Sequence, residues 1–384
     1  MTDFDTAYLE SYTSGHLRLQ PTGYESFIPT PVNHEWTWED SRINMLLEEA
    51  TRALVALDAF SRIVPNVDLF IQLHILKEAN ASSRIEGTRT EMDEALRPEE
   101  DVAPEKRDDW REVQNYVRAM NKAIDALDDL PLSTRLLRRT HAILMQGVRG
   151  QNKRPGAYRK SQNWIGGATL QDAHFVPPPH TDVPDLMSDL EKFWHNDAIN
   201  VPHLVRIAIS HYQFETIHPF LDGNGRIGRL LITLYLISHG FLSKPSLYLS
   251  SYIERHKATY YDALTTVRGT GDLGHWVRFF LVAVRETAQQ GGDTFEAIQA
   301  LRERAERQVL DLGQKAGNAR QLLTLLYRQP WIRAKDAANH LDVTHQTAMS
   351  LIRDLEDLGL LKETTGQQRN RRYVFAEYLN LFTR

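Results

Sequence analysis

The stretch HPFLDGNGRIGR, His218–Arg229, lies between two strongly apolar segments, 202–215 and 225–240. The spacing of the apolar residues predicts a helix in each segment, so the stretch contains the turn between them. Gly223 and Gly225 allow the backbone to turn tightly and to approach a ligand closely. The N–H groups that begin the second helix can then point at one phosphate, which predicts an anion-binding loop.

The polar side chains of this stretch predict phosphate-transfer chemistry. Arg226 and Arg229 are three residues apart, hence on one helix face, where both guanidinium groups can reach phosphate oxygens. Asp222 directly precedes the loop, and a carboxylate beside phosphates indicates an intervening Mg²⁺. Asn224 can hydrogen-bond a phosphate without adding charge. His218 has the side-chain pKa suited to accepting a proton from an attacking hydroxyl.

The stretch resembles the signature of the Fic family, HxFx(D/E)GN(G/K)RxxR. Every fixed position is met, by His218, Phe220, Asp222, Gly223, Asn224, Gly225, Arg226 and Arg229. The resemblance implies a helical core in which the motif joins two central helices, and the transfer of AMP from ATP to a protein hydroxyl. It assigns catalysis to His218, Mg²⁺ binding to Asp222 and anchoring of the loop to Phe220. It assigns the ATP phosphates to Gly223, Asn224, Gly225, Arg226, Ile227, Gly228 and Arg229.

Two further segments extend the resemblance. Residues 156–179 contain a Gly-Gly pair between short runs and then three prolines, which predicts a β-hairpin over about 163–176. It looks like the family's flap, which positions the target backbone; a purely structural hairpin is the alternative. Three tyrosines lie where related proteins surround the adenine, and of these only Tyr261 is assigned to ATP, because buried tyrosines usually belong to a core.

The segment SSRIEGT, Ser82–Thr88, predicts an inhibitory element. A helix expected to end at Glu86 is followed by Gly87, so the Glu86 carboxylate lies at the negative helix end and needs a cation. Ser82, Glu86 and Gly87 match the family's inhibitory motif, (S/T)xxxE(G/N). By this resemblance Glu86 pairs with Arg229 and intrudes on the γ-phosphate site. The alternative is an exposed charge at a helix end.

The composition bounds the class of protein. The chain of 384 residues exceeds the size of a single core, and its formal charge of −5 gives no chain-wide attraction to nucleic acid or anionic lipid. It contains no cysteine, begins without the pattern of a secretory signal, and has its longest apolar run over 230–242, shorter than a membrane span. We therefore expect a cytoplasmic protein without a membrane partner.

Three regions are expected along the chain. Residues 1–115 form an N-terminal helical region with the inhibitory motif, beginning with an irregular arm over 1–35. Residues 116–300 form the catalytic core, and residues 310–384 form a winged helix-turn-helix domain. The predicted fold class is mainly α, with a Fic helical core, a small β-hairpin flap and the C-terminal winged helix.

The sequence of the expected winged helix supports two interpretations of what this domain binds. The expected recognition helix, 344–358, carries Arg353 against three acidic residues, whereas the expected wing carries Arg369, Arg371 and Arg372. DNA binding and a role in protein contact or spacing are weighed equally on this pattern.

The preferred function is that of a protein adenylyltransferase autoinhibited by Glu86. Such a nucleotidyltransferase uses ATP and Mg²⁺ to modify Ser, Thr or Tyr hydroxyls of a target protein and of itself. One alternative is a Fic-type enzyme that uses another nucleotide donor or removes AMP. The other is a nucleotide-sensing regulator that binds DNA. The family resemblance also allows a homodimer.

Overall fold

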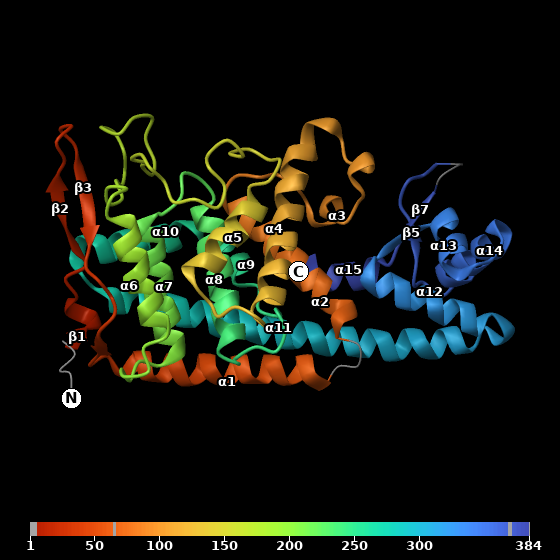
Figure 1. Ribbon diagram of the computed structural model, residues 1–384. Helices are drawn as coiled ribbons and strands as arrows, with labels where there is room; N and C mark the ends of the chain where they lie inside the picture. The colour runs from red at the N-terminus through yellow and green to blue at the C-terminus, as the bar shows by residue number, and fades with distance from the viewer. Residues whose placement is uncertain (1–5, 64–66, 368–370, 384) are drawn as a thin grey trace.

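The computed structural model describes residues 6–63, 67–367 and 371–383, most of which lie in helices (Figure 1). The longest helix, α11 (Leu273–Leu310), packs along α1 (Ser41–Ile63). Figure 1 shows this pair running beneath the other helices, with α11 continuing towards the C-terminal helices at the right. The predicted fold class, mainly α with small amounts of β structure, is confirmed.

The helices between α1 and α11 surround the loop that carries the motif. Every residue of α7 from Leu204 to Ile217 is buried, as expected for a helix at the centre of a core. In the described ranges, no helix is long and apolar enough to cross a membrane. The helices are α2 (Asp68–Ile85), α3 (Met92–Ala95), α4 (Arg107–Ala126), α5 (Thr134–Leu144), α6 (Val183–Trp194), α7 (His203–Ile217), α8 (Asn224–Ser238), α9 (Leu249–Arg255) and α10 (Lys257–Thr270). Short 3₁₀ turns lie at Leu9–Ser11, Glu99–Asp101, Pro104–Lys106 and Gly313–Lys315.

The N-terminal segment is not the irregular arm that we expected. β2 (Gly15–Leu19) and β3 (Glu25–Pro29) form an antiparallel pair, while β1 (Thr6–Tyr8) pairs in parallel with β4 (Glu35–Thr37). The strands are too short, at three to five residues, for a period of two to stand out among prolines and aromatics. β3 also donates a backbone hydrogen bond of 2.9 Å to Val176, so this hairpin lies against the flap.

The flap is a compact loop rather than the regular β-hairpin that we expected. One antiparallel bridge joins Ile165 and Phe175, and 156–179, all of it described, contains no strand. Gly166 and Gly167 take positive φ angles of 70° and 73°, so the chain turns directly after Ile165. The Asp172 carboxylate accepts hydrogen bonds from two backbone N–H groups of the tip. These local contacts fix the tip of the loop in a conformation that leaves only one bridge pair between its two sides.

The C-terminal region combines helices with a three-stranded antiparallel sheet in the order β5–β7–β6. Its elements are α12 (Ala316–Arg328), β5 (Trp331–Arg333), α13 (Ala334–Leu341), α14 (His345–Asp357), β6 (Lys362–Glu363), β7 (Arg372–Val374) and α15 (Ala376–Thr383). The winged helix-turn-helix stays a prediction, and Arg369 of the expected wing lies outside the described residues. The expected boundaries at 115/116 and 300 fall inside α4 and α11, so no break in secondary structure marks them.

Candidate active site

His218 follows α7 directly and is held in a left-handed backbone conformation (φ 50°, ψ 61°). Few non-glycine residues adopt it, so it requires support from its surroundings. The buried Arg159 supplies this support, because its Nε donates to His218 O at 2.9 Å and its Nη2 to Ile217 O at 3.3 Å. Asn163 of the flap donates to His218 O at 3.3 Å and to Phe220 O at 2.9 Å. Sequence reasoning missed Arg159, since an isolated arginine follows no pattern.

The His218 ring is in the protonation state that a general base requires. Burial lowers the pKa of His218 to about 4, so the ring is neutral near pH 7. Its Nδ1 lies 3.4 Å from Glu215 O. A carbonyl oxygen only accepts, so we assign the ring hydrogen to Nδ1. This assignment leaves Nε2 with a free lone pair.

The turn between α7 and α8 is tied together by Asn224. Its Oδ1 accepts from Phe220 N at 2.8 Å, and its Nδ2 donates to Phe220 O at 2.9 Å. Both ends of the Asn224 amide thus bond the loop itself, and the predicted contact of its side chain with phosphate stays a prediction. Gly223 forms the N-cap of α8 with a φ of 77°, the left-handed conformation that glycine adopts without strain.

A histidine of α5 anchors the other side of this turn. His141 Nδ1 accepts from Gly156 N at 2.9 Å, so its Nε2 carries the hydrogen and donates to Asp222 O at 2.9 Å. The His141 ring also stacks on Phe220 with centroids 3.9 Å apart. Phe220 is fully buried and anchors the loop, as the resemblance implied. Sequence reasoning did not single out His141, which lies 81 residues from Asp222.

The first turn of α8 offers backbone N–H groups to an anion. The N–H groups of Asn224, Gly225 and Arg226 precede the first hydrogen bond within the helix. Ile227 N already donates to Gly223 O at 3.1 Å. The Ile227 N–H thus belongs to the helix and its side chain is buried, and the predicted phosphate contact of Ile227 stays a prediction.

Gly228 faces a buried carboxyl group instead of the loop opening. A Cβ atom at Gly228 would lie 2.2 Å from Glu215 Oε1, so glycine makes room for this side chain. The Gly228 carbonyl oxygen accepts from His211 Nδ1 at 2.9 Å. Gly228 therefore packs against the core on this side, and its predicted role in phosphate binding stays a prediction. Burial raises the pKa of Glu215 to about 7, and Glu215 Oε1 has no hydrogen-bond partner among the described residues.

The two arginines of the motif reach different partners. Arg226 Nη1 donates to Glu112 Oε2 at 2.9 Å, and both side chains are 4% exposed. Arg229 Nε donates to Ser82 Oγ at 2.9 Å, and its Nη2 donates to Glu86 Oε1 at 2.7 Å. The buried Glu112 thus pairs with Arg226, and the expectation that both guanidinium groups reach phosphate stays a prediction.

The Glu86 carboxylate lies at the N-terminal turn of α8. Glu86 caps α2, followed by Gly87 with a φ of 103°, as the sequence indicated. A Cβ atom at Gly225 would lie 2.3 Å from Glu86 Oε1, so the carboxylate contacts the backbone where an anion would dock. Burial raises the pKa of Glu86, but the Arg229 guanidinium outweighs burial and the pKa is lowered overall. The group is therefore charged near pH 7.

The Asp222 carboxylate is partly exposed and lies beside two cationic side chains. Its side chain is 33% exposed, with Oδ2 at 3.1 Å from Lys153 Nζ and Oδ1 at 3.7 Å from Arg226 Nη2. Across the described part of the chain, no three His, Asp or Glu residues gather as a ready-made metal site. Mg²⁺ typically binds one or two carboxylates together with phosphates and water. Asp222 therefore fits Mg²⁺ in company with phosphate oxygens.

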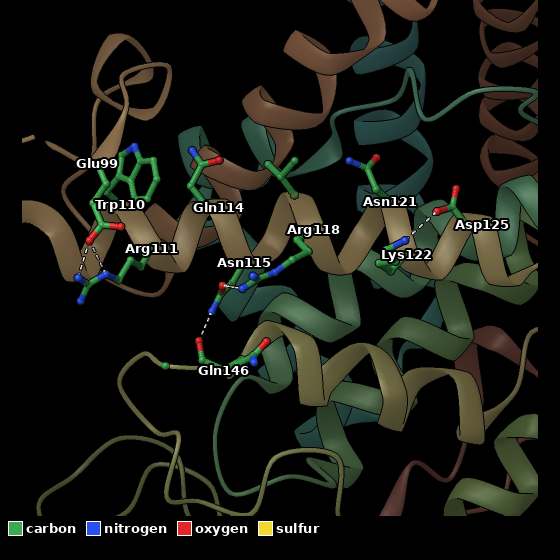
Figure 2. A pocket seen from close by; sticks show the side chains of 12 residues that line it. Glu99, Trp110, Arg111, Gln114, Asn115, Arg118, Asn121, Lys122, Asp125 and Gln146 are labelled. Carbon is green, nitrogen blue, oxygen red and sulfur yellow. Dashed lines mark hydrogen bonds and ion pairs between the residues drawn. The ribbon is translucent and has the colours of Figure 1, made fainter. Parts of the chain in front are cut away.

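An open groove of about 970 Å³ adjoins this site. Its walls are the β2–β3 hairpin, the flap and α10, and Glu215 and Tyr261 line it. Tyr261 is 40% exposed, whereas its neighbour Tyr260 is buried and contacts it edge-on. The Arg268 guanidinium lies 3.8 Å from the centroid of Phe175 and so joins α10 to the flap. A second groove, of about 770 Å³, runs along α4 (Figure 2), and its described lining includes no residue of the motif.

Comparison with known proteins places this site in a family. Residues 44–125 match the model of the Fic/DOC family N-terminal region, and residues 131–236 match that of the Fic/DOC family. The chain is 34% identical over 133 residues to the protein adenylyltransferase Fic of Aedes aegypti, covering 34% of this chain and 24% of that relative. It is 39% identical over 89 residues to a probable protein adenylyltransferase of Aquifex aeolicus, covering 23% of this chain and 26% of the relative. The chain thus spans about a quarter of the length of these curated relatives.

Two solved structures share the fold. A Fic family protein from Desulfovibrio desulfuricans G20 has a TM-score of 0.56 at 23% identity, covering 90% of this chain and 98% of that protein. A Fic domain containing signaling protein from Bacteroides thetaiotaomicron has a TM-score of 0.51 at 19% identity, covering 66% of this chain and 97% of that protein. At these identities the likeness concerns the fold alone. The two family models show that this chain carries a Fic/DOC family N-terminal domain over residues 44–125 and a Fic/DOC family domain over residues 131–236.

Proposed function

We propose that this protein is an adenylyltransferase that moves AMP from ATP to a hydroxyl group of a target protein, and of itself. The observation that carries the proposal is the position of His218. Its neutral ring lies in the turn between α7 and α8, just before the first helical turn of α8. Arg229 lies on the same helix α8. A proton acceptor beside an anion-binding helix end suits attack of a hydroxyl on a phosphate. The names of the curated relatives agree with this reaction class.

In the proposed reaction, the target hydroxyl oxygen attacks the α-phosphorus of ATP and gives its proton to His218 Nε2. The new bond joins the target oxygen to the α-phosphorus, and the bond from the α-phosphorus to the bridging oxygen breaks, releasing pyrophosphate. The N–H groups of Asn224, Gly225 and Arg226 would stabilise phosphate charge during this step. Arg159 and Asn163 would act indirectly, by fixing the backbone of His218.

Asp222 is the residue that would hold Mg²⁺. The cation supplies positive charge to phosphate oxygens when it is bound. His141 orients the loop through Asp222 O, and Lys153 keeps the carboxylate near the loop. Arg226 would support the site indirectly, since its guanidinium is bonded to Glu112.

Glu86 is proposed to inhibit the enzyme by occupying the site of an ATP phosphate. Its carboxylate bonds Arg229 and contacts Gly225 at the helix end, so it stands where a phosphate oxygen would otherwise be bound. Ser82 fixes the same guanidinium through Oγ and through its carbonyl oxygen, each at 2.9 Å. ATP must therefore displace Glu86 or bind with its phosphates shifted.

The donor and the transferred group are tested with labelled nucleotides. Purified Glu86→Gly protein is incubated with Mg²⁺ and ATP labelled at either the α- or the γ-phosphate. The proposal predicts protein-bound label from α-labelled ATP and none from γ-labelled ATP. Label from the γ-position would indicate phosphoryl transfer and contradict the proposal. A panel of unlabelled nucleoside triphosphates as competitors tests the alternative of another donor, and release of AMP from premodified protein tests the reverse activity.

A further inference from the structure

A third groove, of about 970 Å³, lies in the C-terminal region and is lined mainly by cationic side chains. Its walls are α13, α14 and the described residues Thr365, Gln367 and Arg371 between β6 and β7, and it is bounded by the 3₁₀ turn Glu99–Asp101 of the N-terminal region. Figure 1 shows α13 and α14 beside β5 and β7 at one end of the molecule, remote from α7. The cations of its lining are Arg333, Lys335, Arg353, Arg371 and Arg372, against the carboxylates of Asp101 and Asp336.

Only part of this charge is neutralised by the described residues. Asp101 accepts hydrogen bonds from both Arg333 and Arg372, the latter at 2.6 Å. Lys335 and Arg353 have no hydrogen-bond or ion-pair partner in the described part of the chain. One carboxylate thus serves two arginines while two further cations stay free. A chain with a formal charge of −5 therefore concentrates positive charge at one groove, which favours an anionic ligand.

Among anionic ligands, the exposed polar face of α14 favours a nucleic acid duplex. α14 is joined to α13 by a short turn at Asp342, whose φ is 51°, and Thr344 caps it by accepting from Thr347 N. The first-turn side chains His345, Gln346 and Thr347 are all exposed. Polar side chains at the start of a helix can reach base edges in the major groove, while flanking cations hold the phosphates.

We propose that this groove binds duplex DNA, with Asp101 acting as a competitor for Arg333 and Arg372. Lys335 and Arg353 contact phosphates on either side of the α14 N-terminus, and Asp101 occupies two arginines in the absence of DNA. Asp101 precedes α4 of the N-terminal region. Trp331, over whose ring Arg333 and Arg372 lie, donates its Nε1–H to Leu96 O at 2.6 Å. DNA that recruits Arg333 and Arg372 therefore loosens a contact between the C-terminal region and the segment that follows α2.

The test measures binding of a labelled duplex of mixed sequence, two helical turns long, to the full chain by fluorescence anisotropy across a salt titration. Wild type is expected to bind with an affinity that falls steeply with salt. Lys335→Ala with Arg353→Ala is expected to weaken binding at least about tenfold at low salt and to reduce the slope of log K against log salt by about 2. Asp101→Asn is expected to tighten binding by up to about fivefold, the scale of an exposed ion pair.

The matched control is Arg328→Ala, which removes an exposed cation of α12 outside the groove lining and should leave the affinity unchanged. Thermal melting followed by circular dichroism checks that each variant is folded. If the double variant is unfolded, the proposal is tested by whether Asp101→Asn tightens DNA binding. Equal affinity of wild type, double variant and Asp101→Asn would overturn the proposal. Competition by single-stranded DNA or polyglutamate as strong as that by the duplex would also overturn it, and would indicate a general polyanion or acidic-protein site.

Discussion

Glu86→Gly is expected to tighten the binding of ATP. In the folded protein the Glu86 carboxylate accepts from Arg229 Nη2 at 2.7 Å and contacts the first turn of α8 at Gly225. ATP that uses this helix end must first separate the pair. A hydrogen bond between charged groups contributes about 1.5 to 3 kcal/mol. The Glu86 side chain is 33% exposed, so solvent screening reduces this contribution to about 1 to 2 kcal/mol.

This free energy converts to a factor of about 5 to 30 in the dissociation constant of ATP. The assay is isothermal titration calorimetry of wild type and Glu86→Gly with Mg²⁺ and a non-hydrolysable ATP analogue. Glu91→Gly is the matched control, since Glu91 lies close in sequence to Glu86 but pairs with the exposed Arg84. Equal dissociation constants for folded wild type and Glu86→Gly would refute the reasoning that the carboxylate competes with phosphate.

Three further predictions concern the residues around His218, and the two activity tests use the Glu86→Gly background. Arg159→Lys is expected to lower kcat at least about tenfold with little change in ATP affinity, because one ammonium group cannot replace the guanidinium bonds to both His218 O and Ile217 O; unchanged kcat would exclude this positioning role. The activity should stay flat from about pH 8 to 6 and decline as the pH approaches 4, because burial lowers the pKa of His218 to about 4 and its protonation removes the acceptor; a pH–rate profile with a midpoint near 6.5 would contradict this. Gly228→Ala is expected to destabilise the protein by about 1 to 3 kcal/mol, because its Cβ would overlap Glu215 Oε1, and adding Glu215→Ala should restore much of that loss. Denaturant unfolding of the single and double variants measures both effects. A double variant no more stable than Gly228→Ala would contradict the expected overlap.

The sequence was most informative where function depends on neighbouring positions. The turn at Gly223 and the end of α2 at Gly87 follow from local conformational rules, whereas the burial of Phe220 was implied by the family resemblance; the structure has all three. The pairing of Glu86 with Arg229 spans 143 residues. It was foreseen by family resemblance rather than by spacing.

Other parts of the site could not be predicted, because they depend on contacts between distant segments. Arg226 points to Glu112, which lies 114 residues away, and no pattern in the motif distinguishes it from Arg229. Arg159 and His141 hold the loop by bonding backbone carbonyl groups. Such bonds leave no sequence signal, because any carbonyl group can accept them.

The short strands could also not be predicted from local sequence patterns. β1 and β4 pair across an intervening hairpin, so their three-residue strands are defined by tertiary contact. The flap has strand-like composition, yet the Asp172 side chain closes its tip and leaves one bridge pair at Ile165.

The most direct test of the central claim compares Glu86→Gly with the double variant Glu86→Gly and His218→Ala. Each is incubated with Mg²⁺ and ATP, and its intact mass is measured with time. We expect the single variant to gain the mass of one or more AMP groups and the double variant, folded and still binding ATP, to gain none. Equal modification of both proteins would show that His218 is not the catalytic base. Absence of modification in both, with ATP bound, would contradict self-directed adenylyl transfer.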